Sequence, residues 1–132
     1  MVALIDTNVL IWYDMNDDRL SAKAVSIIED TSNIIYVSAA SIWEMAILIS
    51  NGDLVFYNDL DSVVKQIKLK YQFKVLPILN RHSIYVSSMP YPHPKHKNPF
   101  DRLIIAQAIV EQIPLIASDA FFGNYDSLKL IW

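Results

Sequence analysis

The sequence predicts a single α/β domain, residues 1–132, built as a three-layer sandwich: a central parallel sheet of about five strands with helices on both faces. Short, continuous apolar runs alternate with longer segments of helical periodicity along the whole chain. Strands that are apolar throughout are typical of parallel sheets buried between helices. The length suits one domain, and 53% hydrophobic against 19% charged residues argues against disorder.

The first third of the chain contains two predicted strands separated by helices. Residues 2–5 form an apolar run that leads directly into Asp6, as a buried strand does when a helix follows. Residues 20–30 have helical spacing, with Ser21 as the expected N-terminal cap. Residues 34–37 are the second predicted strand.

A buried helix is predicted next, followed by three further elements. Ser41 and Glu44 have the S-x-x-E spacing of a capping box, and Asn51-Gly52 is a typical helix end. The elements that follow are an amphipathic helix, a third strand and a short helix, over residues 59–71, 73–76 and 80–88.

The last third begins with a loop whose four prolines, all within residues 89–99, rule out regular structure. Asn98 is the expected cap of the next helix, with Pro99 at its first position and Asp101 in its first turn, and this helix should extend to about residue 112. Residues 115–117 are the fourth predicted strand, which leads through Ser118-Asp119 into a turn or short helix, and residues 128–131 are the fifth strand.

Four carboxylates each stand alone in an apolar window: Asp6, Glu44, Asp101 and Asp119. An ionised carboxylate in apolar surroundings costs several kcal/mol unless a partner compensates it, and the chain has too few Lys and Arg to serve all four. Asp6 and Asp119 directly follow predicted strands, and ligand sites of parallel sheets lie beyond the carboxyl ends of the strands. We therefore predict that the four site carboxylates converge on divalent metal.

Each carboxylate also has a purely structural interpretation. Asp6 could cap a helix, Glu44 could complete the capping box, Asp101 could interact with a helix dipole, and Asp119 could begin a turn. One metal site explains all four at once, and oxygen ligands without thiolate suit Mg2+ or Mn2+, as one or two ions. Such ions activate water for the hydrolysis of a phosphodiester bond, so no protein nucleophile is required.

Four segments carry the motifs just described, in order along the chain: LIDTNVLIW, VSAASIWEMAI, NPFDRLIIAQA and LIASDAFFGNY. Together they resemble a PIN domain of the VapC toxin family over essentially the whole chain. The resemblance implies a PIN-like fold, metal-dependent endoribonuclease activity on RNA, a small cognate antitoxin and a homodimer. It also implies that Asp6, Glu44, Asp101 and Asp119 form the catalytic and metal-binding site.

One position departs from the pattern of the relatives. Many relatives have Asp before the PFDR motif, where this chain has Asn98. An amide binds hard cations less strongly than a carboxylate, so a second ion would be held loosely if this position is a ligand. If the position only caps the helix, Asn serves equally well.

Other residues are candidates for supporting roles. The hydroxyls of Thr7 and Ser118 could orient a carboxylate, although a helix cap is an equal alternative for each. Residues 95–97 and Arg102 form a candidate positive rim for RNA phosphates beside Asp101. The alternatives are an ordinary solvated loop and, for Arg102, an ion pair with a site carboxylate.

The three histidines give no metal site by themselves. His93 and His96 lie two residues apart in the loop sequence HPKH, but no Cys and no further clustered His completes a zinc site. His82 lies on the predicted short helix without an apparent partner. We interpret His93 and His96 as loop histidines and not as zinc ligands.

Composition excludes several other classes. The absence of Cys removes thiolate chemistry, no phosphate-binding glycine loop or serine-hydrolase elbow occurs, and no apolar run is long enough to span a membrane. We expect a cytoplasmic protein. The net charge of -3 and the amide at Asn98 keep one rival open, a degenerate PIN fold that acts as a binding or scaffolding module. A receiver-type phosphoacceptor ranks third, because its adjacent acidic pair has no counterpart.

Overall fold

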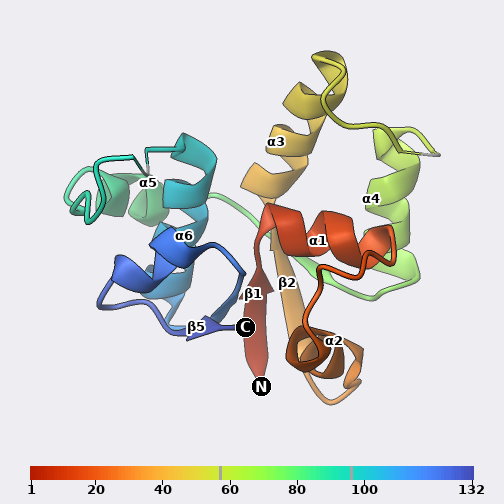
Figure 1. Ribbon diagram of the computed structural model, residues 1–132, viewed down its shortest axis with the longest axis horizontal. Helices are drawn as coiled ribbons and strands as arrows, with labels where there is room; N and C mark the ends of the chain where they lie inside the picture. Colours follow the sequence, from red (N-terminus) through yellow and green to blue (C-terminus); the bar gives the residue numbers. More distant parts are fainter. Residues whose placement is uncertain (57, 96) are drawn as a thin grey trace.

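A five-stranded parallel sheet forms the centre of the computed structural model, which describes residues 1–56, 58–95 and 97–132 (Figure 1). The strand order is β3-β2-β1-β4-β5, so β1 lies in the middle, between β2 and β4. All four strand pairs are parallel, and Ile5 at the end of β1 lies opposite Val37 and Ile116. The strands are β1 Val2–Ile5, β2 Ile34–Ser38, β3 Lys74–Leu76, β4 Leu115–Ile116 and β5 Leu130–Ile131.

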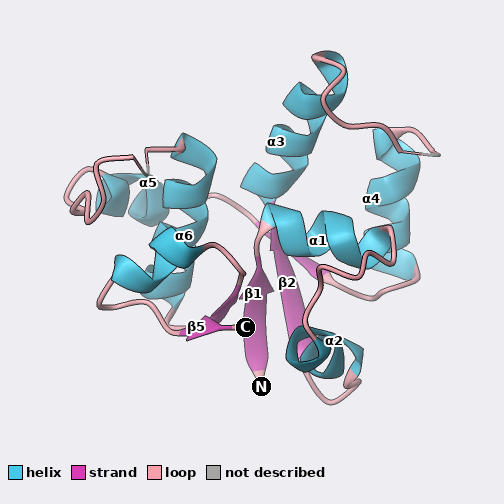
Figure 2. Ribbon diagram, in the orientation of Figure 1, coloured by secondary structure: helices cyan, strands magenta, loops and turns pink. Residues whose placement is uncertain are grey.

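Helices alternate with these strands along the chain and surround the sheet (Figure 2). They are α1 Thr7–Asp14, α2 Ala22–Glu29, α3 Ala39–Ser50, α4 Leu60–Leu69, α5 Asn80–Val86, α6 Pro99–Glu111 and the 3-10 helix η1 Ala120–Asn124. The predicted α/β fold, the parallel sheet and the order of elements are therefore confirmed, with small differences at the ends of individual elements.

The hydrophobic core is divided between the two faces of the sheet. Alternate side chains of β1 point to opposite faces: Ala3 and Ile5 pack with α1, α2 and α4, whereas Leu4 packs with α6. Strands buried on both faces have no polar side to present to water, which explains why they read as continuous apolar runs in the sequence. This packing is the predicted three-layer sandwich.

The start of α6 agrees closely with the prediction. The Asn98 side-chain Oδ1 accepts hydrogen bonds from the backbone N–H groups of Phe100, at 2.9 Å, and Asp101, at 3.3 Å. Pro99 occupies the first helical position, where its missing N–H costs nothing. Asp101 consequently lies in the first turn of a well-defined helix.

The start of α3 differs from the prediction. The helix begins at Ala39 with Ser38 as its cap, whose Oγ accepts from the Ala40 N–H at 3.0 Å. Ser41 is instead buried inside the helix, so it forms no capping box with Glu44, which lies in the second turn. The helix follows β2 without a loop, and the serine at the strand end is therefore the one positioned to cap it.

None of the helices in the described ranges is both long enough and apolar enough to cross a lipid bilayer.

Candidate active site

Asp6 lies at the centre of the carboxyl edge of the sheet. Its backbone N–H donates to the Ile116 carbonyl of β4 at 3.2 Å, and its side-chain Oδ1 caps α1 by accepting from the Val9 N–H at 2.8 Å. The residue is only 4% exposed. Burial raises the pKa of Asp6 from 3.8 to about 7, although the hydrogen bond from Val9 acts in the opposite direction.

The other three candidate carboxylates act on Asp6 electrostatically. Next to burial, the charges of Asp101, Asp119 and Glu44 each raise the pKa of Asp6. The topology explains this arrangement, because β1 lies between β4, which Asp119 follows, and β2, which leads directly into the helix carrying Glu44. The fold thus brings the negative charge of the other three residues close enough to influence Asp6 at the carboxyl edge of the sheet.

Capping roles and membership of this cluster coexist. Asp119 caps η1, with its Oδ1 accepting from the Phe121 N–H at 2.9 Å, just as Asp6 caps α1. A cap requires one oxygen of a carboxylate, so the structural and the metal-binding interpretations do not compete for the same atom. Glu44 caps nothing, and its buried Oε1 has no hydrogen-bond partner in the described part of the chain.

This donor set suits a hard divalent cation. Among the described residues, no Lys or Arg side chain forms an ion pair with Asp6, Glu44 or Asp119, and a buried acceptor without a partner is costly. Oxygen ligands of this kind bind Mg2+ and Mn2+. As they stand, no three carboxylates or imidazoles of the described residues are close enough to enclose one ion, so a cation would have to draw these side chains inward.

Two predicted supporting hydroxyls have different surroundings. Thr7 is buried and its hydroxyl donates to the Ser41 Oγ at 2.9 Å, which ties α1 to α3. Among the described hydrogen bonds, the Thr7 hydroxyl neither caps a helix nor binds a site carboxylate. Ser118 is exposed between β4 and η1, one residue before Asp119.

The structure removes Arg102 from the predicted positive rim. Its side chain is 3% exposed, and its guanidinium donates to the Pro90 carbonyl at 2.8 Å, the Met89 carbonyl at 3.2 Å and the Tyr125 hydroxyl at 3.2 Å. A proline-rich loop lacks the regular partners of its carbonyls, and Arg102 supplies donors for two of them. Lys95 and Lys97 of that rim are exposed, and residue 96 lies outside the described residues.

His82, which has no apparent partner in the sequence, is fully buried and bonded at both ring nitrogens. Its Nδ1 accepts from the Leu79 N–H at 3.0 Å, and its Nε2 lies 3.0 Å from the Glu111 carboxylate of α6. Hydrogen bonds from Arg81 first, and then from His82, lower the pKa of Glu111 to about 2. This network fastens α5 to α6 and has no link to the site carboxylates in the described contacts.

His93 contributes to packing next to the site. Its ring lies on Phe121, with 4.3 Å between the ring centroids, and its Nδ1 accepts from the Lys95 N–H at 3.1 Å. Phe121 is the residue whose backbone N–H binds Asp119.

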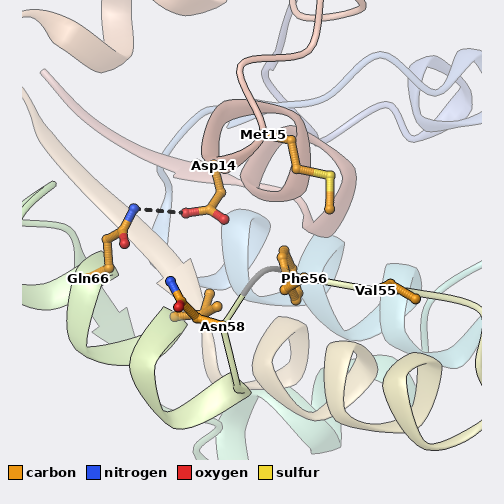
Figure 3. Close-up of a pocket in the computed structure, with 7 residues that line it drawn as sticks. Asp14, Met15, Val55, Phe56, Asn58 and Gln66 are labelled. Carbon is orange, nitrogen blue, oxygen red and sulfur yellow. Dashed lines mark hydrogen bonds between the residues drawn. The ribbon is translucent and has the colours of Figure 1, made fainter.

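A separate apolar groove of about 490 Å3 is found where α1, α4 and the segment before α4 meet (Figure 3). On one side Gln66 donates to the Asp14 Oδ1 at 3.3 Å, and on the other Val55 is 79% exposed. The described lining residues are Asp14, Met15, Val55, Phe56, Asn58, Val63 and Gln66. The sequence offered no signal for this groove, because residues from three separate segments form it.

Comparison with known proteins decides the family. The PIN domain family matches residues 3–128. The chain belongs to the PIN domain family. Comparison with curated protein sequences gave no match.

Solved structures similar to this PIN domain share its fold over nearly their whole length. A chain of VapBC2 from Rickettsia felis, bound to a promoter DNA fragment, has a TM-score of 0.73 at 14% identity, with 99% of this chain and 98% of that chain covered. FitAcB from Neisseria gonorrhoeae gives 0.64 at 20% identity, with 100% and 97% covered. VapBC-1 from nontypeable Haemophilus influenzae gives 0.65 at 18% identity, with 99% and 97% covered.

Proposed function

We propose that this PIN domain is a metal-dependent endoribonuclease and the toxin of a VapBC-type toxin-antitoxin pair. The observation that carries the proposal is the buried Asp6 carboxylate, whose pKa is raised by burial and by the charges of three further acidic residues. Among the described ion pairs, none joins Asp6, Glu44 or Asp119 to a Lys or Arg. PIN domains are in general nucleases, and the fold resembles chains of VapBC and FitAB complexes.

Asp6, Glu44, Asp101 and Asp119 would hold Mg2+ or Mn2+. When bound, such an ion polarises the phosphodiester and activates water. The chain's own residues fix the ligands: the Val9 N–H holds the Asp6 carboxylate, and the Thr7–Ser41 hydrogen bond keeps α1, next to Asp6, against the helix that carries Glu44. Preorganisation of this kind lets a ligand meet the ion without reordering its backbone.

Asn98 favours one firmly held ion over two. Its side-chain oxygen accepts two backbone N–H groups at the start of α6, which is a full structural role for an amide at this position. Relatives that carry Asp there could use the same residue as cap and ligand. In this chain we assign Asn98 to the cap and the ion to the four carboxylates.

The test is cleavage of total RNA by the purified protein with Mg2+ or Mn2+, with the cut ends mapped. Asp6→Asn and Asp101→Asn should each abolish cutting. Asp61→Asn is the matched control, because Asp61 is exposed on α4, where it pairs with Lys65 at 2.9 Å. Activity that survives both site substitutions would contradict the proposal.

A catalytically degenerate PIN fold that acts as a scaffold is the alternative. The observation in its favour is that no three carboxylates of the described residues lie close enough together to hold one metal ion. Calorimetric titration with Mn2+ separates the two functions. Binding that is lost in Asp119→Asn favours the nuclease, and no binding at millimolar Mn2+ favours the scaffold.

The proposed antitoxin is a small protein with an amphipathic segment that occupies the groove of Figure 3. Apolar side chains line this groove, and Asp14 gives it an acidic border suited to a basic residue of the partner. The neighbouring gene's product should co-purify with the protein. Val55→Lys should weaken this association, whereas Leu69→Lys, at an equally exposed position on α4, should not.

A homodimer in the cytoplasm completes the proposal, on the family resemblance. Light scattering coupled to size exclusion should give twice the mass of one chain. A monomer at high concentration would contradict the dimer and leave the nuclease proposal standing.

A further inference from the structure

A solvent-exposed tryptophan is next to Glu44 in the chain and contacts the neighbour of Asp101. Trp43 is 60% exposed, and no other large apolar side chain of α3 among the described residues is strongly exposed. It directly precedes Glu44 in the chain, and its indole makes an edge-to-face contact with Phe100, at 5.0 Å between ring centroids and 77° between planes. Phe100 in turn directly precedes Asp101.

This aromatic pair spans the contact between α3 and α6, the two helices that carry Glu44 and Asp101. Glu44 and Asp101 are two of the four candidate metal ligands, and Trp43, which directly precedes Glu44, is open to solvent. Contact with Phe100 limits the orientations of the indole. An aromatic surface is therefore held in place within one residue of two candidate metal ligands.

We propose that Trp43 is a substrate-binding residue that stacks on an RNA base next to the phosphate to be cut. This inference rests on the proposed nuclease function and adds a specific contact to it. Aromatic rings that bind unpaired bases contribute affinity without positive charge, because every base has a π face.

Charge explains why such a contact is needed here. The chain has a net charge of -3, its site is acidic, and the burial of Arg102 removes one cation from the rim that flanks Asp101. Contacts with RNA phosphates alone should therefore give this protein only a low affinity for RNA. Stacking supplies attraction that acidic neighbours do not oppose.

The other strongly exposed apolar side chains lie elsewhere in the described structure. Met1 precedes β1, Val55 precedes α4, Leu69 ends α4, Ile84 belongs to α5 and Tyr91 lies between α5 and α6, so none of them shares α3 with Trp43. Protein interfaces are usually built on contiguous apolar patches, whereas a single held ring beside a catalytic site suits a base. This difference favours RNA over a protein partner at Trp43.

The experiment measures binding of a fluorescein-labelled, single-stranded RNA dodecamer in EDTA, where cleavage cannot occur. Trp43→Ala should weaken binding roughly tenfold, and Trp43→Phe should restore most of it. The matched control Leu69→Ala should bind like the wild type. A dodecamer of the same length with abasic positions should bind wild type and Trp43→Ala equally, since it offers no base to stack.

Tryptophan fluorescence tests the contact in a protein that keeps Trp43, so a folding defect of Trp43→Ala does not affect the result. In the Trp12→Phe/Trp132→Phe background, Trp43 is the only tryptophan of the chain, and the RNA dodecamer should quench its fluorescence while the abasic one should not. Equal binding by Trp43→Ala and wild type, or no quenching, overturns the proposal. So does a Trp43→Ala protein that loses only self-association or antitoxin binding.

The outcome is separable from that of the nuclease proposal. RNA bound through Trp43 by a protein that never cuts would refute the nuclease and keep this contact. Cutting by Trp43→Ala with an unchanged KM would refute this contact and keep the nuclease.

Discussion

Replacement of Asp6 by Asn should stabilise the metal-free protein at neutral and alkaline pH, although it should abolish the proposed cleavage of RNA. Asp6 is buried at the carboxyl edge of the sheet, among the charges of Asp101, Asp119 and Glu44. Asn has the same shape, and its side-chain oxygen can still accept the Val9 N–H that caps α1. The substitution therefore removes the buried charge and leaves the local structure intact.

The magnitude follows from the pKa of Asp6. Its pKa rises from 3.8 to about 7, and each pH unit of difference corresponds to about 1.4 kcal/mol. The folded state holds the proton more tightly than the unfolded state, so ionisation costs stability as the pH rises from about 4 to about 7. Above pH 7 the ionised Asp6 lowers the free energy of unfolding by its full amount, about 4 kcal/mol at most. Burial of the Asn amide also costs free energy, so Asp6→Asn should raise the stability by about 2–4 kcal/mol.

The assay is guanidinium denaturation of both proteins in EDTA at several pH values. The two proteins should have similar stability near pH 4, and the advantage of Asp6→Asn should grow up to about pH 7 and then stay constant. Millimolar Mn2+ should stabilise the wild type and have no such effect on Asp6→Asn. A less stable Asp6→Asn at pH 8 in EDTA would refute the reasoning, because it would mean that the ionised carboxylate is favourable where it lies.

Two further predictions concern residues outside the site. Arg102→Ala should lower the free energy of unfolding by about 3 kcal/mol in chemical denaturation, because the Met89 and Pro90 carbonyls lose their buried donor. Arg102→Lys should lower the free energy of unfolding by less, since Lys replaces only part of the guanidinium's hydrogen bonds. Glu111 has a lowered pKa, so its contribution to stability is fully present above about pH 4.5 and lost as the pH falls toward 2. Acid unfolding should therefore show a weaker pH dependence in Glu111→Gln than in the wild type, and an unchanged curve would contradict this role.

Local sequence signals were sufficient for much of the fold. The Asn98-Pro99 start of α6 depends on groups within one helical turn, and the hydrogen bonds from Phe100 and Asp101 to Asn98 are the ones expected. The parallel sheet could be predicted because both of its faces are covered, which leaves continuous apolar runs in the chain. Asp6 and Asp119 could be located because Asp6 directly follows β1 and Asp119 is separated from the end of β4 by only two residues.

Features that depend on distant residues could not be predicted in the same way. Ser41 has the spacing of a cap, but its partner is the Thr7 hydroxyl, 34 positions away in the chain. His82 forms a hydrogen bond with Glu111 on another helix. Arg102 donates hydrogen bonds to the Met89 carbonyl and the Tyr125 hydroxyl and is not open to solvent. A charged residue in a loop or a first helical turn is usually exposed to solvent. Arg102 is buried because the carbonyls of Met89 and Pro90 need hydrogen-bond donors, and this depends on the tertiary structure.

The capping and metal-binding interpretations of the carboxylates are separate in the sequence, and the structure joins them. A cap at a strand end fixes one carboxylate oxygen to backbone N–H groups, and in doing so it holds the carboxylate at the edge where the parallel strands end. Asp6 shows the consequence, because the Val9 N–H favours its ionised form while burial and the neighbouring charges oppose it more strongly. A divalent cation would reverse that balance, since it replaces repulsion by attraction without disturbing the cap. On the proposed function, the same backbone hydrogen bonds that stabilise the helix starts would also hold the carboxylates ready for a metal ion, so neither interpretation excludes the other.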